Sequence, residues 1–439
     1  MMIKSLLLGA AAGIAALGAA HAADLPMTKG EAVEYVKVCS TFGPGYFYIP
    51  GSDTCLKIGG EIRADYRAFG GDRFSSLGQY INKSSFNRND NRTAFNTQAR
   101  IWFDARTQTD WGLLRSYFQI NADSHPISQG GRSNTYNGNS FSIDKAFIQF
   151  GGLTAGYAHS FFGFYDNEYG DTIWAPYYAE SNTVNLIAYT AQFGGGFSAT
   201  LSIEDGRDHR SNSVINGYIP GGQQVPDVVG QLRYDADWGS LAVQAAGHQN
   251  RNGEAVSAAT GAVIPGPHTN KYGYAVGGTV LIKLPFIDAG HFIVEGQYAN
   301  AATDYLGGGA TVLGTADVLP TTIAAGPLGR GFEEGKGWSI VGELGGNITP
   351  VLNANLVGSY IDTNYDKAYS ATELKIKEYT IAGNLTYTVV KGLTVAGEVS
   401  YTHVSADNAP YFVPTSIFPA LRDVSGNVWQ AGIRIKRTF

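Results

Sequence analysis

Uncharged and charged residues alternate along a segment near the start of the chain. In LKIGGEIRADYR, residues 56–67, every second position from Leu56 to Tyr66 is uncharged, and the other file contains all the charged residues. Successive side chains of a β-strand point to opposite faces, so this pattern predicts a strand with one uncharged and one charged face. Two environments fit such a strand: a soluble antiparallel sheet with one face on a core, or a transmembrane barrel with lipid outside and water inside.

The same period recurs along the rest of the chain and predicts an all-β protein of sixteen strands. The predicted strands cover residues 56–67, 95–106, 114–122, 145–150, 153–160, 184–193, 197–204, 228–235, 241–248, 272–283, 292–299, 338–347, 352–360, 378–388, 393–402 and 428–439. Their connections alternate between short turns rich in Gly, Pro and Asp and longer polar loops. Outer-membrane barrels show this alternation, with short periplasmic turns and long extracellular loops. We therefore expect an antiparallel transmembrane β-barrel over residues 56–439.

The last predicted strand, residues 428–439, should pair with the first, because only a closed barrel leaves no unpaired strand edge in lipid. Its uncharged file ends at Phe439, whereas Arg434 and Lys436 fall on the inward file. Arg437 breaks the pattern, because it falls on the file that faces lipid. It lies near the chain end, where a long Arg side chain can reach the membrane interface.

The first 22 residues have a different character. Lys4 precedes an apolar run, and Ala20-His21-Ala22 forms a small-residue cleavage pattern, so residues 1–22 read as a secretory signal peptide. A membrane anchor is the alternative, but the run is short and interrupted by Gly. No later window approaches the ~20 consecutive apolar residues of a membrane helix. Lipid contact in the mature chain is therefore expected from strands. Residues 23–55 are expected to form a separate N-terminal segment before the barrel.

Composition agrees with this assignment and narrows the function. The chain has 57 Gly, 26 Tyr and 22 Phe, as expected of a Gly- and aromatic-rich β protein. Asp and Glu (37) outnumber Lys and Arg (31), and no basic domain is apparent, so we expect no nucleic-acid partner. The His residues are scattered, and neither H-E-x-x-H nor G-x-S-x-G occurs. We therefore expect no catalytic site.

The only two cysteines, Cys39 and Cys55, lie in the turn-rich stretch VCSTFGPGYFYIPGSDTCL. In an exported chain this spacing predicts a disulfide that closes a small hairpin before the first barrel strand. A metal site and a reactive thiol are the alternatives, but two Cys without a nearby His do not make a structural zinc set. We expect neither a metal nor a cofactor.

The chain resembles the trimeric general porins of alphaproteobacterial outer membranes, of the rhizobial and brucella type. The likeness is closest in EAVEYVKVCSTFGPGYFYIPGSDTCLKIGGEIR, residues 31–63, and in the closing AGIRIKRTF; it extends through DKAFIQFGGLTAGYAHSFF over most of the mature chain. The resemblance implies a water-filled homotrimeric diffusion pore in the cell outer membrane of a Gram-negative bacterium. It also implies contact with lipid and lipopolysaccharide, and recognition by the assembly machinery of a C-terminal strand ending in Phe439.

The third long loop, residues 161–185, is the candidate for narrowing the pore. It is acidic and contains no Lys or Arg. By its residues alone it is equally an acidic surface loop or an inward-folded one; the resemblance implies the inward fold. We expect its carboxylates to line the constriction: Asp166, Glu168, Asp171 and Glu180. Basic residues on the inward files of the first three strands and the last should form the opposite wall: Arg63, Arg100, Arg115 and Arg434.

The expected function is passive diffusion of ions and small hydrophilic solutes, because charged rings select permeating ions by sign and no chemistry is required. The alternative is a substrate-selective channel, for example for sugars, in which aromatic residues line a path. The candidates for that path are Trp102, Tyr117, Trp174, Tyr177 and Tyr178. A receptor or adhesin role of the loops is a third reading.

Overall fold

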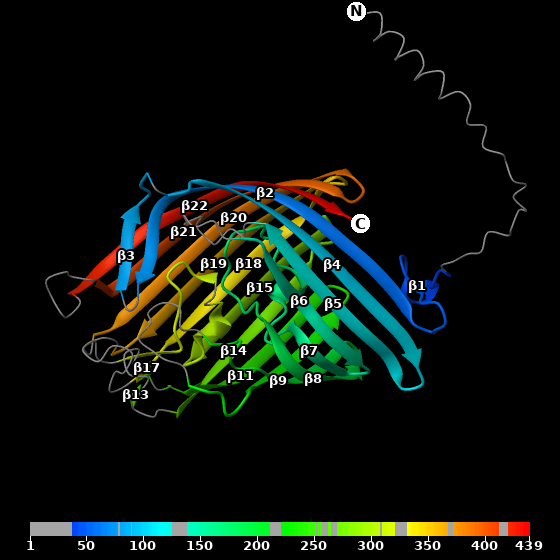
Figure 1. The fold of residues 1–439 in the computed structure, drawn as a ribbon, viewed down its shortest axis with the longest axis horizontal. Coiled ribbons are helices and arrows are strands. Elements are labelled where there is room, and N and C mark those ends of the chain that lie inside the picture. The colour runs from blue at the N-terminus through cyan, green and yellow to red at the C-terminus, as the bar shows by residue number, and fades with distance from the viewer. Residues whose placement is uncertain are drawn as a thin grey trace, which may run out of the picture.

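The protein, analysed as a computed structural model, is described over residues 37–77, 80–88, 90–124, 138–210, 221–251, 253, 255–256, 262–264, 270–307, 310–320, 332–367, 372–411 and 420–439. Among these residues, sixteen strands form one closed antiparallel barrel (Figure 1). The barrel strands are β2 (Cys55–Leu77), β4 (Thr93–Thr109), β5 (Gly112–Ser124), β6 (Ser140–Phe150), β7 (Leu153–His159), β8 (Thr183–Gly194), β9 (Phe197–Glu204), β10 (Asp227–Ala236), β11 (Gly239–Arg251), β14 (Asn270–Lys283), β15 (Asp288–Asn300), β18 (Lys336–Thr349), β19 (Leu352–Tyr365), β20 (Leu374–Val390), β21 (Leu393–Tyr411) and β22 (Ala420–Thr438).

The remaining elements are short and lie in the N-terminal segment and the loops. They are η2 (Ser40–Phe42), β1 (Phe47–Tyr48), β3 (Tyr80–Ser85), α2 (Tyr165–Glu168), β12 (Ala255–Val256), β13 (Val263–Ile264), η3 (Thr303–Leu306), β16 (Val318–Pro320) and β17 (Phe332–Glu334). In the described part of the chain, no helix has the length and apolar character needed to cross a membrane. The signal peptide predicted for residues 1–22 lies outside the described residues.

The two-residue alternation of the sequence separates the two faces of the wall as predicted. On β2, Ile58 and Ile62 are 44% and 50% exposed on the outer face, while Asp65 and Arg67 on the other file are each 6% exposed. An apolar outer face suits lipid, and a charged inner face suits water. The strand continues well past the predicted end at residue 67, because its far end forms a hairpin with β3 that the membrane-type alternation does not reveal.

The barrel closes where β22 pairs with β2, which lie side by side as the red and blue ribbons in Figure 1. Phe439 completes the pair, since its N–H donates to the Gly60 carbonyl at 2.9 Å and its own carbonyl accepts from the Gly60 N–H at 3.1 Å. Arg437 is exposed on the outer face, as its place in the sequence predicts. Its guanidinium donates to the Lys391 carbonyl at 3.2 Å, so the charge lies at a short turn at the end of the barrel.

Seven short turns and eight longer connections alternate between the described barrel strands, which gathers the long loops at one end. Two of them concern the pore. Loop L3, residues 160–182, joins β7 to β8, and loop L6, residues 301–335, joins β15 to β18. L3 folds into the barrel, as predicted. The described part of L6 also folds into the barrel and packs against L3.

Candidate functional site

L3 enters the barrel through a glycine. Gly163 has a φ of +85°, and a Cβ at this position would lie 2.5 Å from Oε1 of Glu295 on β15. The Glu295 carboxylate accepts the backbone N–H groups of Phe164 at 3.3 Å and Tyr165 at 3.2 Å. Only glycine fits here, for two reasons. A Cβ would collide with the carboxylate, and residues with a side chain rarely adopt such a φ.

A second wall glutamate, Glu343 on β18, holds the middle of L3. Its Oε2 accepts the Tyr165 hydroxyl at 2.6 Å and the N–H of Asp171 at 3.1 Å. The Tyr165 ring is buried in an apolar cluster with inward-facing residues of β14, β15, β18 and β19. Apolar packing and charge-assisted hydrogen bonds therefore fasten L3 to the same part of the wall.

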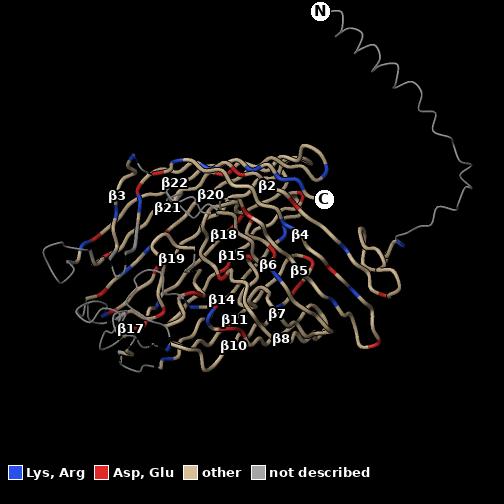
Figure 2. The backbone as a smooth tube through the Cα atoms, in the orientation of Figure 1, with Lys and Arg blue, Asp and Glu red and all other residues tan. Residues whose placement is uncertain are grey.

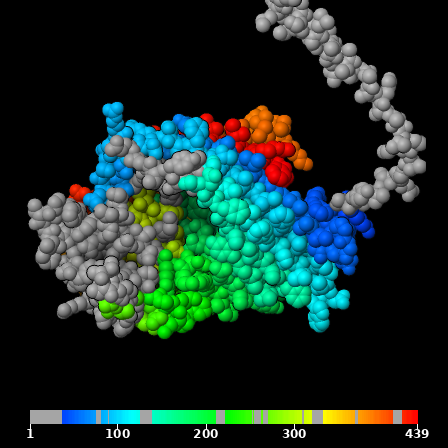
Figure 3. All heavy atoms as spheres, in the orientation of Figure 1, coloured from blue at the N-terminus to red at the C-terminus, as the bar shows by residue number. Residues whose placement is uncertain are grey.

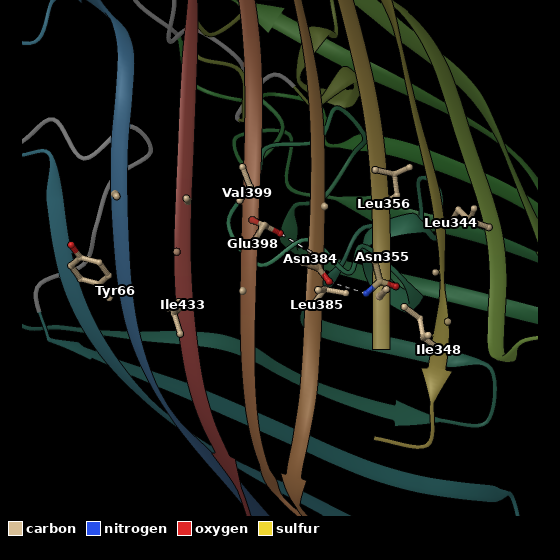
Figure 4. Close-up of a pocket in the computed structure, with 18 of the residues that line it drawn as sticks. Tyr66, Leu344, Ile348, Asn355, Leu356, Asn384, Leu385, Glu398, Val399 and Ile433 are labelled. Carbon is tan, nitrogen blue, oxygen red and sulfur yellow. Dashed lines mark hydrogen bonds between the residues drawn. The ribbon is translucent and has the colours of Figure 1, made fainter. Parts of the chain in front are cut away.

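Glu398 on β21 captures the next stretch of L3. Its carboxylate accepts the N–H groups of residues 173, 174 and 175 at 2.6, 2.8 and 2.8 Å. Figure 4 shows Glu398 in a row with Asn384 and Asn355 across three neighbouring strands, joined by hydrogen bonds of 3.5 and 3.1 Å. Asn384 also donates to the Asp171 carbonyl at 2.7 Å, so this row supports the loop over several residues.

Trp174 attaches L3 to β2 and β22, the two strands that close the barrel. Its indole N–H donates to Asp65 on β2 at 3.1 Å, and its carbonyl accepts from Gln430 on β22 at 3.0 Å. The guanidinium groups of Arg67 and Arg434 lie 5.7 and 5.2 Å from the ring centre, within the range of cation–π attraction. Arg434 is also held by Asp65 through two bonds of 2.7 and 2.6 Å.

L6 packs on L3 inside the barrel, an arrangement that the sequence did not reveal. Tyr305 and Leu306 are fully buried and share a cluster with Phe162 and Tyr178 of L3. Gly307 has a φ of +80°, and a Cβ there would lie 2.6 Å from the L3 backbone. Figure 3 shows the olive segment that follows residue 300 within a hollow between the cyan and green strands. Two loops therefore narrow the interior.

Five glutamates on inward files bind the backbone of these loops. They are Glu204, Glu295, Glu343, Glu378 and Glu398, and none is more than 2% exposed. Glu204 accepts the N–H of Phe161 at 3.1 Å, and Glu378 accepts those of Val312 and Leu313 in L6, both at 2.8 Å. Their sequence signal is a Glu on the inward file of a strand that contains no Arg.

Two of the predicted basic residues lie on the wall formed by β2 and β4. Arg63 on β2 pairs with Glu61 at 3.1 Å, and Arg100 on β4 lies 3.8 Å from the same carboxylate. Arg100 also donates to Gln98 at 2.9 Å. Both signs of charge occur along β2 and β4 in Figure 2. The wall is thus a mixed-charge lattice in which acids orient the guanidinium groups.

Arg115 on β5 belongs to a second part of this lattice. Asp104 on β4 accepts from its Nε at 2.9 Å and its Nη2 at 3.0 Å, and Gln149 accepts from Nη1 at 3.0 Å. The guanidinium also lies 5.2 and 5.5 Å from the ring centres of Tyr117 and Phe147, which stack on each other. These contacts fix its position on the inner wall.

The four loop acids occupy different environments. Asp166 lies 3.6 Å from His159, and burial raises the pKa of its carboxyl to about 7, although nearby Lys145 opposes the shift. Glu168 pairs with Arg233 on β10. The Asp171 side chain is 48% exposed, and its partial burial together with the Glu343 charge raises the pKa of its carboxyl to about 6.

Glu180 is set apart from the other three. It is 5% exposed and lies 3.8 Å from Nδ1 of His209, whose Nε2 lies 2.8 Å from Glu204. Burial raises the pKa of the Glu180 carboxyl well above its usual value, against the effect of His209. This carboxylate faces a cluster between loops rather than open space.

A polar cavity of about 410 Å³ lies between L3 and the strands β5, β6, β7 and β10. L3 contributes Phe164 and Asn167, and the strands contribute Arg115, Lys145 and Gln149. Basic residues of the wall therefore line this space on one side, and uncharged residues of L3 close it on the other. Such an arrangement sorts small charged solutes and requires no bond making or breaking.

Comparison with known proteins agrees with this geometry. A family model described as a porin subfamily matches residues 24–420. The chain belongs to this porin family. Porin Omp2b of Brucella suis biovar 1 is 34% identical over 258 residues, and Porin Omp2a of Brucella melitensis biotype 1 is 34% identical over 267; each alignment covers 55% of this chain and 65% of the relative. The chain thus spans just under two thirds of these relatives.

The outer membrane channel DcaP of Acinetobacter baumannii shares the fold of this porin. Its TM-score is 0.60 at 15% identity, covering 89% of this chain and 99% of that chain. At this identity the likeness concerns the fold alone. Family membership and the closed barrel together place the protein in the outer membrane of a Gram-negative bacterium.

The N-terminal segment of this porin contacts the inner wall at the end with short turns. Cys39 and Cys55 form the predicted disulfide. The Tyr46 hydroxyl donates to Asp104 at 2.8 Å, and the Arg106 guanidinium lies 5.1 Å from the Tyr46 ring centre. Because Asp104 and Arg106 lie on an inward file, the segment lies toward the lumen, a position that the sequence left open.

Proposed function

We propose that the protein forms a water-filled channel for passive diffusion of ions and small hydrophilic solutes across the outer membrane, and that it is not an enzyme. The observation that carries this proposal is the attachment of L3 across the barrel interior. Glu295 on β15, Glu343 on β18 and Glu398 on β21 hold its backbone at three points along the loop. A fixed constriction of this kind filters by size and charge without a reaction step.

Single-channel recording of the purified protein in a planar bilayer tests the proposal. We expect stepwise currents whose conductance rises in proportion to salt concentration at high salt. Absence of channel steps from correctly folded protein would refute it.

We propose that a modest cation preference arises from Asp166, Glu168 and Asp171. Glu180 is left out of this filter because it is buried beside His209. The basic residues oppose this preference only in part, because Arg115 is paired with Asp104 and Arg434 with Asp65. A cleft with low-dielectric walls strengthens the field of the remaining charges.

A substrate-selective channel is the second candidate, and the stacked rings of Tyr117 and Phe147 beside the polar cavity favour it. Two of the other aromatic candidates do not, because Tyr178 is fully buried and Trp174 packs on Arg67. Saturable current that a sugar blocks would support this candidate, whereas linear, unblocked current supports general diffusion.

We also propose that the functional unit is a homotrimer in contact with outer-membrane lipid and lipopolysaccharide, and that the assembly machinery recognises the strand ending at Phe439. Its apolar outer files, such as Ile58 and Ile62, suit lipid. Native mass spectrometry in mild detergent should show three copies; a monomer alone would contradict the assembly. Deletion of Phe439 should lower the amount inserted into outer membranes.

A further inference from the structure

We propose that Asp171, His291 and Glu343 form a binding site for a divalent transition-metal ion such as Zn²⁺. One ligand atom from each of the three residues lies within 4.8 Å of the other two, the one such His, Cys, Asp or Glu group found in the described part of the chain. This departs from the expectation, made from the sequence, of a protein without a metal. Metal binding is not part of the proposed channel function, and it can be measured whether or not the barrel conducts.

The donor set has the chemistry and spacing of such a site. Nε2 of His291 lies 2.9 Å from Oε1 of Glu343 and 3.8 Å from Oδ2 of Asp171. Zinc binds imidazole nitrogen at about 2.0–2.1 Å and carboxylate oxygen at about 2.0–2.2 Å. Ligand atoms around one ion are therefore separated by about 3.3 Å in a tetrahedral site, which lies between the two distances observed.

The histidine is oriented as a metal ligand is. Its Nδ1 lies 3.2 Å from the Ala289 carbonyl, and because a carbonyl only accepts, Nδ1 carries the proton of this bond. When Nε2 loses its proton, its lone pair is directed at the carboxylates of Glu343 and Asp171. Metal-bound His residues almost always donate their other ring N–H in this way.

The backbone is shaped to make that contact. β15 has a register irregularity between Asp288 and His291, and Ala289 within it has a φ of +52°, which is unusual for a residue with a side chain. A bulge re-aims the side chain that follows it. Here it directs the imidazole inward, toward β18.

The carboxylates of Glu343 and Asp171 differ in their surroundings. Oε2 of Glu343 is occupied by the Tyr165 hydroxyl and the Asp171 N–H, which leaves Oε1 facing His291. Glu343 and His291 are buried, whereas Asp171 is half exposed on the loop. The site therefore has two fixed ligands in the wall and one on L3, with an open side from which the ion and water ligands enter.

Titration of the purified full-length protein with ZnCl₂ by calorimetry tests the site, with Co²⁺ absorption as a second readout of the ligand set. We expect one Zn²⁺ per chain and at least tenfold weaker binding in His291→Gln and in Asp171→Asn. The second variant guards against misfolding, because L3 is fastened through the backbone of Asp171. His403→Gln is the matched control, since His403 is hydrogen-bonded to Asn427 away from L3.

Two results would overturn the proposal. One is failure of the folded native protein to bind Zn²⁺ at all. The other is binding by His291→Gln and Asp171→Asn with the stoichiometry and affinity of the native protein, which would place the ion elsewhere. Neither result bears on channel formation, which bilayer recording measures separately.

Discussion

The carboxylate of Glu398 on β21 lies 2.8 Å from the backbone nitrogen of Trp174 and binds the N–H groups on either side of it as well. One buried charge thus fixes three consecutive residues of L3. A hydrogen bond to a charged acceptor contributes about 1.5–3 kcal/mol, so its removal should matter to the loop.

Glu398→Ala should release this part of L3 and give larger, noisier single-channel currents than the native protein. Glu398→Gln, which keeps one acceptor oxygen, should give an intermediate result. The control is Glu373→Ala, because Glu373 lies in the connection before β20 and binds Asn364 instead of L3. Unchanged conductance and noise in Glu398→Ala would show that this carboxylate does not hold the loop.

The three acids assigned to the filter should control ion selectivity. A variant with Asp166→Asn, Glu168→Gln and Asp171→Asn should lose most of the cation preference, measured as the reversal potential across a salt gradient. At an effective dielectric of ~20, a charge 4 Å away is worth roughly 4 kcal/mol to a passing ion. High salt should weaken the preference, since the Debye length falls from ~10 Å at 0.1 M to ~3 Å at 1 M.

Glu180→Gln is the matched control for that experiment, because Glu180 belongs to the same loop but is buried beside His209. It should leave the reversal potential close to the native value. Loss of selectivity in Glu180→Gln alone, or an anion-selective native channel, would contradict the assignment.

The cation preference should depend on pH. A carboxyl is neutral below its pKa, and burial raises the pKa of Asp166 to about 7 and that of Asp171 to about 6. The preference should therefore be greatest above these values and fall as the pH is lowered from about 8 to about 5. Reversal potentials at constant ionic strength measure it.

Asp166→Asn should remove the part of this dependence near pH 7 and keep the part near pH 6. A preference that stays constant over the whole range in the native protein would show that neither carboxyl titrates in the conducting path.

Gly163→Ala should destabilise the entry of L3. The positive φ by itself costs on the order of 1–3 kcal/mol for a residue with a side chain, and the added methyl group would also meet the Glu295 carboxylate. We expect a lower unfolding temperature in detergent, measured by circular dichroism, together with noisier channels.

Gly195→Ala separates the two effects. Gly195 has a φ of +60° in the turn between β8 and β9, with nothing within 4 Å of an added Cβ. It should show the cost of the backbone conformation without the collision. Equal destabilisation by the two substitutions would mean that the contact with Glu295 contributes nothing.

The sequence by itself determined the wall of this protein. The direction of a strand side chain depends only on its position in the strand, so the alternation in residues 56–67 assigned Ile58 to the outer face and Asp65 to the inner face without knowledge of any partner. Closure followed from the same local pattern, because a lipid-facing strand edge must be paired. The Cys39–Cys55 disulfide was also predictable, since the two residues are close in the sequence.

Only the tertiary structure decided what the inward side chains do. Glu180 and Asp171 belong to one acidic loop, yet the fold buries the first beside His209 and leaves the second half exposed next to His291. L6 likewise lies against L3 because Glu378, far along the chain, accepts its N–H groups. These roles depend on contacts between residues tens to hundreds of positions apart, and no local periodicity of the sequence carries that information, because it records the face of each side chain but not the partner it meets there.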